Sequence, residues 1–317
     1  MPVLPADSGS VARAAELLRR GGVVAFPTET VYGLGALAFM PEAVARIFEI
    51  KRRPHFDPLI VHVLDETMLS RVVASIPSAA RLLADRFWPG PLTLVLPKSD
   101  EVPELVTAGL STVAVRMPSH PVARALLAAT GAPLAAPSAN LFGSLSPTRA
   151  EHVAAGIGDA ADLILDGGPT EHGLESTIVA IEGTALLRPG AIEIEAIEAI
   201  VGPLGAAGAS AYSAPGMLPH HYAPATPLRL IDPVTVPMLD RSRAAALAVR
   251  DQFEGYAVSR RLSAGGDLRE AAARFFETLH ELDALALERI DVQPIAESGL
   301  GQAMMDRLRR AAATFGL

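Results

Sequence analysis

Short apolar segments alternate with helical segments along most of the chain, and this alternation constrains the fold more than any other feature. Apolar runs of four or five residues have the length of buried strands, and they lie at 23–26, 59–63, 92–96, 113–116 and 133–136. Apolar residues at helical spacing lie at 8–20, 66–75, 78–87 and 121–130, and in a further helix that Pro41 opens and that ends before Pro54. Some predicted strands follow one another without a helix between them. We therefore expect an α/β fold with a twisted mixed β-sheet and flanking helices, rather than a purely parallel sheet.

Helix start and stop signals agree with this pattern. Ser8 or Ser10 can cap the first helix, and Gly21-Gly22 ends it. Thr148-Arg149-Ala150-Glu151 has the form of a capping box and predicts a helix that starts there. Further strands are predicted at 163–165, 176–181 and 185–187.

The composition changes near residue 202 and predicts a division into domains. Residues 202–227 are rich in Gly, Ala, Ser and Pro and lack periodicity, which is typical of a linker. We predict a catalytic α/β domain at 1–201, a linker at 202–227 that covers the active site, and a smaller domain at 228–317. The smaller domain has the strand and helix pattern of a Rossmann-like α/β unit, with segments at 228–231, 244–249, 268–287, 289–292 and 301–313.

Composition excludes several classes of function. The 317-residue chain has a formal net charge of −8 and a pI near 5.5, which argues against a broad nucleic-acid-coating surface. It has no cysteine, so a disulfide framework, a thiolate metal site and a cysteine nucleophile are excluded. No basic leader and no stretch of ~20 apolar residues is present, so we expect a cytoplasmic protein without a membrane span.

Lys51, Arg52 and Arg53 place three positive charges directly before Pro54 in this acidic chain. Two interpretations stay open. Cations near a helix C-terminus offset the helix dipole and often sit in water. Three cations beside a proline-fixed turn can also converge on a triphosphate, because one arginine binds two oxygens at once.

Polar side chains follow several predicted strands, at the place where α/β sheets bind ligands. Residues 28–30 follow one strand, although a simple turn explains them equally well. Ser138 and Asn140 follow another strand, and Ser146 continues the polar stretch. Small hydroxyl and amide groups suit phosphate or base recognition. Arg116 ends a third strand, where it either reaches solvent or binds a carboxylate at two points.

Two motifs resemble known ligand-binding motifs, but their sequence context argues against those functions. Gly33-Leu34-Gly35 imitates a dinucleotide fingerprint, but its first glycine lies too far from the preceding strand. His220-His221 has no third metal ligand nearby, so we favour a docking role for His221 and Tyr222 over a zinc site.

Several motifs also stand in a fixed order between residues 10 and 225. They occupy 26–35, 51–54, 58–62, 88–93, 115–118, 136–140, 175–179, 188–190 and 215–224. In content and order the chain resembles the YrdC-type threonylcarbamoyl-AMP synthase family, in the long form with an added C-terminal domain. Segments 296–301 and 306–308 extend the resemblance into that domain.

The resemblance implies an L-threonylcarbamoyladenylate synthase, a nucleotidyltransferase. Such an enzyme uses L-threonine, bicarbonate or CO2, and ATP, and releases pyrophosphate. Its product would pass to a downstream threonylcarbamoyl transferase complex for tRNA modification, and Mg²⁺ is expected with the triphosphate. Two alternatives stay open: an RNA-binding module with weak tRNA binding, and a carbamoyl-adenylate former with another acceptor.

The resemblance also assigns residues to the two substrates. Lys51, Arg53, Ser138 and Asn140 would form a central polar tetrad that carries catalysis. The residues expected at ATP are Lys51, Arg53, Asp57, Thr112, Ser138, Ser146, Arg188 and Tyr222. Those expected at threonine are Thr30, His62, Arg116, Ala136 and Ser176. Tyr222 on the linker would close over the nucleotide, because water would hydrolyse both the carbamate and the mixed anhydride.

Position 57 departs from the family pattern. The family usually has asparagine there, whereas this chain has Asp57. A carboxylate repels a triphosphate unless a magnesium ion or an arginine intervenes. Whether Asp57 contacts ATP is therefore left open by the sequence.

Overall fold

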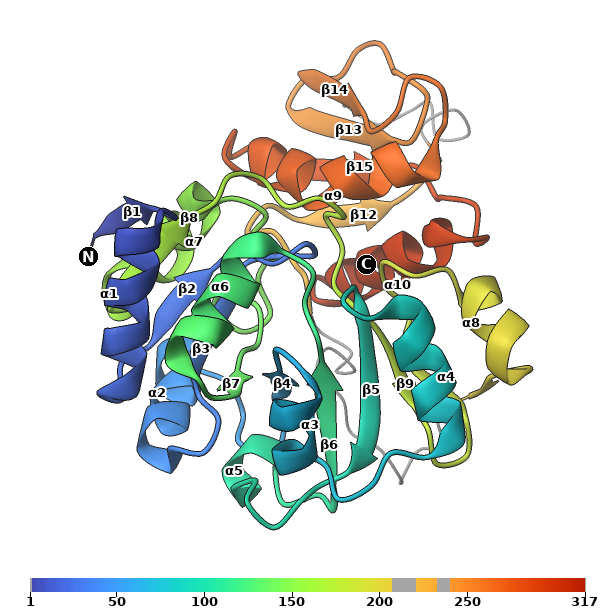
Figure 1. Ribbon diagram of the computed structural model, residues 1–317. Helices are drawn as coiled ribbons and strands as arrows, with labels where there is room; N and C mark the ends of the chain where they lie inside the picture. The colour runs from blue at the N-terminus through green and yellow to red at the C-terminus, as the bar shows by residue number, and fades with distance from the viewer. Residues whose placement is uncertain (1, 207–220, 233–239, 317) are drawn as a thin grey trace.

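The computed structural model describes residues 2–206, 221–232 and 240–316. Within these ranges the chain forms a sheet of eleven strands and a second sheet of four. Figure 1 shows the smaller sheet (orange) with its helices on one side of the larger α/β unit. The prediction of an α/β fold with two units is confirmed. In the described ranges no helix is both long and apolar enough to cross a bilayer.

The larger sheet is mixed. Its strands are β1 (Val3–Pro5), β2 (Val24–Phe26), β3 (Gly33–Leu37), β4 (Ile60–His62), β5 (Leu92–Pro97), β6 (Thr112–Arg116), β7 (Leu134–Ala135), β8 (Leu163–Asp166), β9 (Thr177–Ala180), β10 (Ala185–Arg188) and β11 (Gly205–Ala206). They lie in the order β1-β8-β2-β3-β7-β4-β6-β5-β9-β10-β11. Five neighbouring pairs run parallel and five run antiparallel, as expected where strands follow one another directly.

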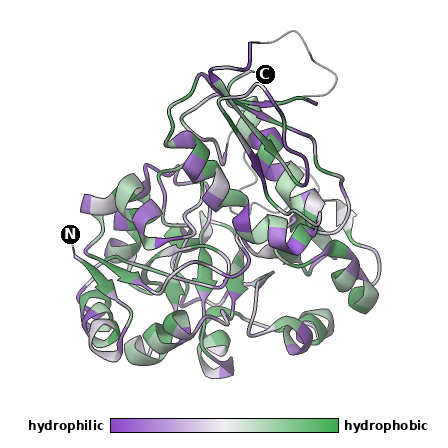
Figure 2. Cartoon of the chain, turned by 90° about the horizontal axis from the view of Figure 1, so that it is seen from above, coloured by the Kyte–Doolittle hydropathy of each residue, from purple (hydrophilic) through white to green (hydrophobic). Residues whose placement is uncertain are grey.

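Helices accompany this sheet along the chain. They are α1 (Ser8–Arg19), α2 (Pro41–Lys51), α3 (Glu66–Val72), α4 (Ser78–Phe87), α5 (Glu104–Thr107), α6 (Pro121–Thr130), α7 (Ala150–Ile157), the 3-10 turn η1 (Gly158–Ala160) and α8 (Ile194–Val201). Figure 2 shows hydrophobic strands in the interior and helices with one hydrophobic and one hydrophilic side. The helices therefore bury one apolar stripe each against the sheet.

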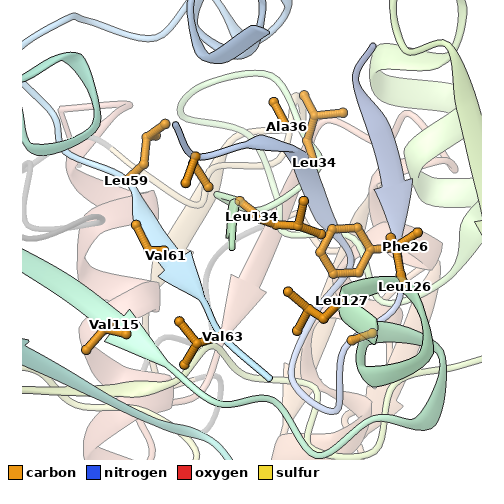
Figure 3. Packing of buried hydrophobic residues seen from close by; sticks show 14 of the residues in the cluster. Phe26, Leu34, Ala36, Leu59, Val61, Val63, Val115, Leu126, Leu127 and Leu134 are labelled. Carbon is orange, nitrogen blue, oxygen red and sulfur yellow. The ribbon is translucent and has the colours of Figure 1, made fainter. Parts of the chain in front are cut away.

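The core explains a strand that the sequence did not predict. Phe26 on β2 and Leu34 on β3 are fully buried and lie close to Leu127 and Leu134 in Figure 3. A Cβ on Gly35 would come within 2.6 Å of the Phe26 ring. Gly35 therefore makes room for an aromatic core residue on the neighbouring strand, and the Gly-Leu-Gly run is a strand rather than a nucleotide loop.

The smaller unit is built on parallel strands. It comprises β12 (Leu228–Leu230), β13 (Ala244–Ala248), β14 (Val258–Arg261), α9 (Leu268–Asp283), β15 (Arg289–Val292) and α10 (Leu300–Ala313). The strand order is β12-β15-β13-β14, with every pair parallel. Phe275, Phe276 and Met304 form part of its buried core. The prediction of a Rossmann-like unit is confirmed, although β14 was not predicted and α9 ends before residue 287.

Two predicted helix caps are wrong. The N-cap of α1 is Asp7, whose Oδ1 accepts a hydrogen bond from the Ser10 amide at 2.8 Å, and neither serine caps the helix. The N-cap of α7 is Arg149, which makes no capping hydrogen bond with its side chain. The Thr148 hydroxyl instead lies 3.3 Å from Nδ1 of His152, so the capping box does not form.

Candidate functional site

The basic segment forms the end of α2. Lys51 is the last helical residue, Arg52 has a left-handed backbone with φ 51°, and the Arg53 amide donates to the Phe48 carbonyl at 2.9 Å. This turn places Lys51 and Arg53 in the interior, at 1% and 6% exposure, while Arg52 is exposed. Two of the three charges are therefore directed inward, which helix-dipole compensation alone would not require.

Lys51 binds the loop that follows β7. Its Nζ donates to the carbonyl oxygens of Ser138 and Asn140, both at 2.6 Å. The Asn140 amide donates to the carbonyls of Leu141 and Ser144, both at 2.9 Å. Burial and the nearby charge of Arg53 lower the pKa of Lys51 well below its usual value. The predicted tetrad is thus brought together, with Lys51 tying the loop to α2.

Asp57 lies against Arg53. Its Oδ2 is 2.9 Å from Nη2 of Arg53, and both side chains are at most 4% exposed. The same guanidinium donates to the carbonyls of Asp57 and Pro58 at 3.0 and 2.8 Å. Burial raises the pKa of Asp57 even though Arg53 and Lys51 oppose that rise. An arginine is therefore the partner that neutralises this departure from the family pattern.

A second buried ion pair joins Glu29, in the loop between β2 and β3, to Arg116 at the end of β6. Arg116 at the end of β6 is 2.7 Å from Glu29 through Nη2 and donates to the Thr30 hydroxyl at 2.9 Å through Nη1. Although burial opposes its charge, Arg116 lowers the pKa of Glu29 to about 2. His62 pairs with Arg116 across β4 and β6, and burial lowers its pKa to about 3. His62 is therefore neutral at pH 7.

Arg188 and Ser176 form the next part of the site. Nη2 of Arg188 donates to the Ser176 carbonyl at 2.9 Å and to its hydroxyl at 3.2 Å. The Ser176 hydroxyl also lies 2.7 Å from Oγ1 of Thr93 on β5. Both Arg188 and Ser176 are buried. These contacts hold a further cation beside the ends of β9 and β10.

Residues 221–223 lie against this region. Tyr222 and His221 are 2% and 5% exposed, and their ring centroids are 4.1 Å apart. The His221 ring also meets Phe142 edge-on at 5.2 Å, and the Ala223 amide donates to the Gly143 carbonyl at 2.8 Å. The segment is thus docked on the loop after β7. The predicted 215–217 motif and His220 lie outside the described residues.

One cavity collects most of the predicted site residues. Those that line it are Thr30, Arg53, His62, Arg116, Ala136, Ser138, Ser176, Arg188 and Tyr222. Outside this lining, Lys51 contacts Ser138, Asp57 contacts Arg53, and Ser146 contacts Glu175, while Asn140 is joined to the site through Lys51. Thr112 begins β6, at the opposite end from Arg116.

Some residues at the cavity were not assigned from the sequence. Glu29 neutralises Arg116, Glu175 lines the cavity, and Arg307 of the smaller unit pairs with Glu175 at 3.1 Å. Glu175 and Arg307 belong to motifs on which the family resemblance rests. Those motifs include both residues but do not predict that the two form an ion pair. Neither residue has a sequence neighbour that would reveal the pairing.

The carboxylates of the site do not form a metal site. Glu29, Asp57 and Glu175 each pair with an arginine, at 2.7, 2.9 and 3.1 Å. In the described part of the chain no three His, Asp or Glu side chains are grouped to hold a metal ion. The described residues therefore do not fit a protein-bound Mg²⁺.

A mixed sheet, a cavity lined by the buried residues Arg53, Arg116 and Arg188, and a second α/β unit on a parallel sheet define a two-unit α/β protein. A family described as "Telomere recombination" matches residues 16–190, and one described as "Threonylcarbamoyl-AMP synthase, C-terminal domain" matches residues 192–313. The chain belongs to the threonylcarbamoyl-AMP synthase family, in its long, two-domain form.

Individual relatives agree with this assignment. The threonylcarbamoyl-AMP synthase of Bacillus subtilis is 43% identical over 98% of this chain and 94% of its own length. That of Pyrococcus abyssi is 41% identical over 94% of this chain and 92% of its own length. The crystal structure of P. abyssi Sua5 complexed with L-threonine matches with a TM-score of 0.91 and 37% identity, covering 99% of this chain and 98% of that one.

Proposed function

We propose that this protein is an L-threonylcarbamoyladenylate synthase, which makes threonylcarbamoyl-AMP and pyrophosphate from L-threonine, bicarbonate or CO2, and ATP. The observation that carries the proposal is the convergence of separate buried arginines on one cavity. Arg116 lines it from the end of β6, and Arg188 lines it from the end of β10, near enough to Arg53 for the two charges to interact. A carboxylate and a triphosphate are the anions that such a pair of sites would bind together.

Arg116 would hold the threonine carboxylate. Its Nε is buried and has no hydrogen-bond partner among the described residues, so one donor is available to a ligand. Thr30, His62, Ala136 and Ser176 would complete the threonine pocket. Because His62 is neutral, it can accept or donate a hydrogen bond to the threonine hydroxyl or amine without repelling a cation.

The other side of the cavity would hold ATP. Lys51, Arg53, Ser138 and Asn140 would form the catalytic tetrad, and the further ATP contacts would be Asp57, Thr112, Ser146, Arg188 and Tyr222. The carbamate oxygen of carboxylated threonine attacks the α-phosphorus, and the bond to pyrophosphate breaks. Buried cations stabilise the charge that develops on the phosphate oxygens and on the leaving group. Mg²⁺ would enter on the oxygens of the triphosphate itself.

Water exclusion is the second requirement of this chemistry, since water destroys both the carbamate and the mixed anhydride. Tyr222 and His221 would supply it as the cover of the cavity. In this proposal the chain divides into a catalytic domain (1–201), a linker (202–227) and a C-terminal domain (228–317). The product would pass to a threonylcarbamoyl transferase complex for tRNA modification in the cytoplasm.

The proposal is tested by incubating the protein with ATP, bicarbonate and L-threonine and analysing the products by mass spectrometry. We expect threonylcarbamoyl-AMP and an equal amount of pyrophosphate. Pyrophosphate release that does not depend on threonine would overturn the proposal and favour another acceptor. Arg53→Ala should abolish turnover. The matched control is Arg71→Ala, which removes an arginine whose side chain is 46% exposed and paired with Glu101 at the surface.

A further inference from the structure

Arg307 connects the smaller unit to the cavity. It lies on α10, and its side chain is completely buried although it carries a charge. Nε and Nη2 both donate to Oε2 of Glu175 at 3.1 Å, and Nη1 donates to the Pro189 carbonyl at 2.6 Å. A buried arginine with this many donors engaged is fixed in one geometry. Both acceptors belong to the larger unit, between β8 and α8.

Glu175 passes this constraint on to a residue of the proposed nucleotide site. Its other oxygen, Oε1, accepts a hydrogen bond from the hydroxyl of Ser146, which is fully buried. Glu175 itself lines the cavity next to Ser176. One carboxylate therefore joins Arg307 to Ser146, with one oxygen committed to each.

The same guanidinium also supports the cover of the cavity. The Cζ atom of Arg307 lies 5.1 Å from the centroid of the Tyr222 ring, within the range of a cation–π interaction. Phe276 on α9 lies 5.9 Å from that ring. Tyr222 has a left-handed backbone with φ 63°, which a tyrosine adopts only when its surroundings hold it. The smaller unit thus contacts the Tyr222 ring from both α9 and α10.

We propose that Arg307 is a positioning residue of the nucleotide half of the active site. Arg307 orients Ser146 through Glu175, and it orients Tyr222 by contact with the face of the ring. The C-terminal domain therefore completes the site and does more than hold the linker. The proposal rests on the proposed function for the identity of the nucleotide. It predicts a selective defect: ATP binding weakens, while Arg116 keeps its partners Glu29 and Thr30, so threonine binding changes less.

The test uses the full-length chain and three substitutions. Arg307→Lys keeps the buried charge but loses the two-point contact, Arg307→Met removes the charge, and Arg307→Met combined with Glu175→Gln also removes the carboxylate left without a partner. Arg309→Met is the matched control on the same helix, because Arg309 is 55% exposed and pairs with Glu297 away from the cavity. Kd values for ATP and for L-threonine are measured separately by calorimetry, and KM for each substrate by pyrophosphate release.

We expect about a tenfold rise in Kd and KM for ATP in the double variant, with the threonine Kd changed less than about twofold. Arg307→Lys should fall between this variant and the parent, and Arg309→Met should match the parent. An ATP Kd within about twofold of the parent in folded Arg307→Lys and in the double variant would overturn the proposal. Equal losses for both ligands would also overturn it, since they indicate a structural role alone. If the parent binds ATP but makes no threonylcarbamoyl-AMP, the proposed function fails, and the ATP measurements still decide the role of Arg307.

Discussion

The buried pair of Glu29 and Arg116 allows a quantitative prediction about stability. Glu29→Gln keeps the size and shape of the side chain but removes its charge, so Arg116 loses the carboxylate that lies 2.7 Å from its Nη2. Both side chains are at most 4% exposed, so bulk water screens their charges little. The substitution therefore leaves a buried, uncompensated guanidinium.

The magnitude follows from the ionisation of Glu29. Its pKa is about 2 in the folded protein against an ordinary value of 4.5. This difference corresponds to about 3 kcal/mol in favour of folding at neutral pH. Removal of one partner of a buried ion pair typically costs about 3–5 kcal/mol, which agrees. Because the pKa is lowered by folding, the stabilisation is complete above pH 4.5 and is lost as the pH falls towards 2.

Urea denaturation, followed by tryptophan fluorescence, measures the stability of the larger unit, which contains Glu29 and Arg116. Trp88 is the single tryptophan and lies between α4 and β5, so its emission reports the larger unit. With an m-value of about 1–3 kcal/mol per molar urea, Glu29→Gln should lower the midpoint by about 1–3 M. The difference in unfolding free energy between parent and variant should be the same at about pH 6 and about pH 8, because Glu29 is ionised in the folded and the unfolded parent at both values.

A change in unfolding free energy below about 1 kcal/mol would refute this reasoning, because it would mean that solvent or another group compensates Arg116. The matched control is Glu101→Gln. Glu101 pairs with Arg71 at 2.8 Å, but the two side chains are 53% and 46% exposed. An exposed pair contributes about 0–1 kcal/mol, so this control should hardly move the midpoint.

Three further outcomes are expected. Burial lowers the pKa of His62 from 6.5 to about 3. As the pH falls below 6.5, the unfolded chain therefore binds a proton at His62 before the folded protein does, and the fold loses stability. In His62→Gln the urea midpoint should fall less between pH 6.5 and 4 than it does in the parent. Asp57→Asn should leave the ATP Kd equal or lower by calorimetry, since it removes a carboxylate beside Arg53, and a large loss would show that the carboxylate has a positive role. Tyr222→Ala should raise the ATP dissociation rate about tenfold in stopped-flow experiments, and an unchanged rate would argue against a covering role.

Much of the fold was predictable because each element has a local signature. Pro41 at the first turn of α2 and the apolar stripes of α6 and α9 predict helices that the structure contains. β3 was missed because Gly33 and Gly35 have low strand propensity, and their role becomes visible only when Phe26 packs above them. The cap of α7 was missed because the Thr148 hydroxyl has a competing contact with His152.

The site was predictable as far as single motifs reach. The motifs marked Arg53, Ser138 and Arg116, and the structure places all three around one cavity. What the sequence could not reveal is which charge neutralises which. The Arg116–Glu29 and Arg307–Glu175 pairs join residues 87 and 132 positions apart, and only the strand order and the docking of α10 bring them together.

The left-handed residue at the end of α2 has a consequence for how this segment can change. The backbone is left-handed at Arg52, where the side chains on either side of it are buried and its own side chain is exposed. A single insertion or deletion between 51 and 53 would therefore exchange an interior cation for a surface one. The identity of residue 52 is comparatively unrestricted, with glycine the least strained choice. Natural variation here should preserve the length of the turn more strictly than its charge.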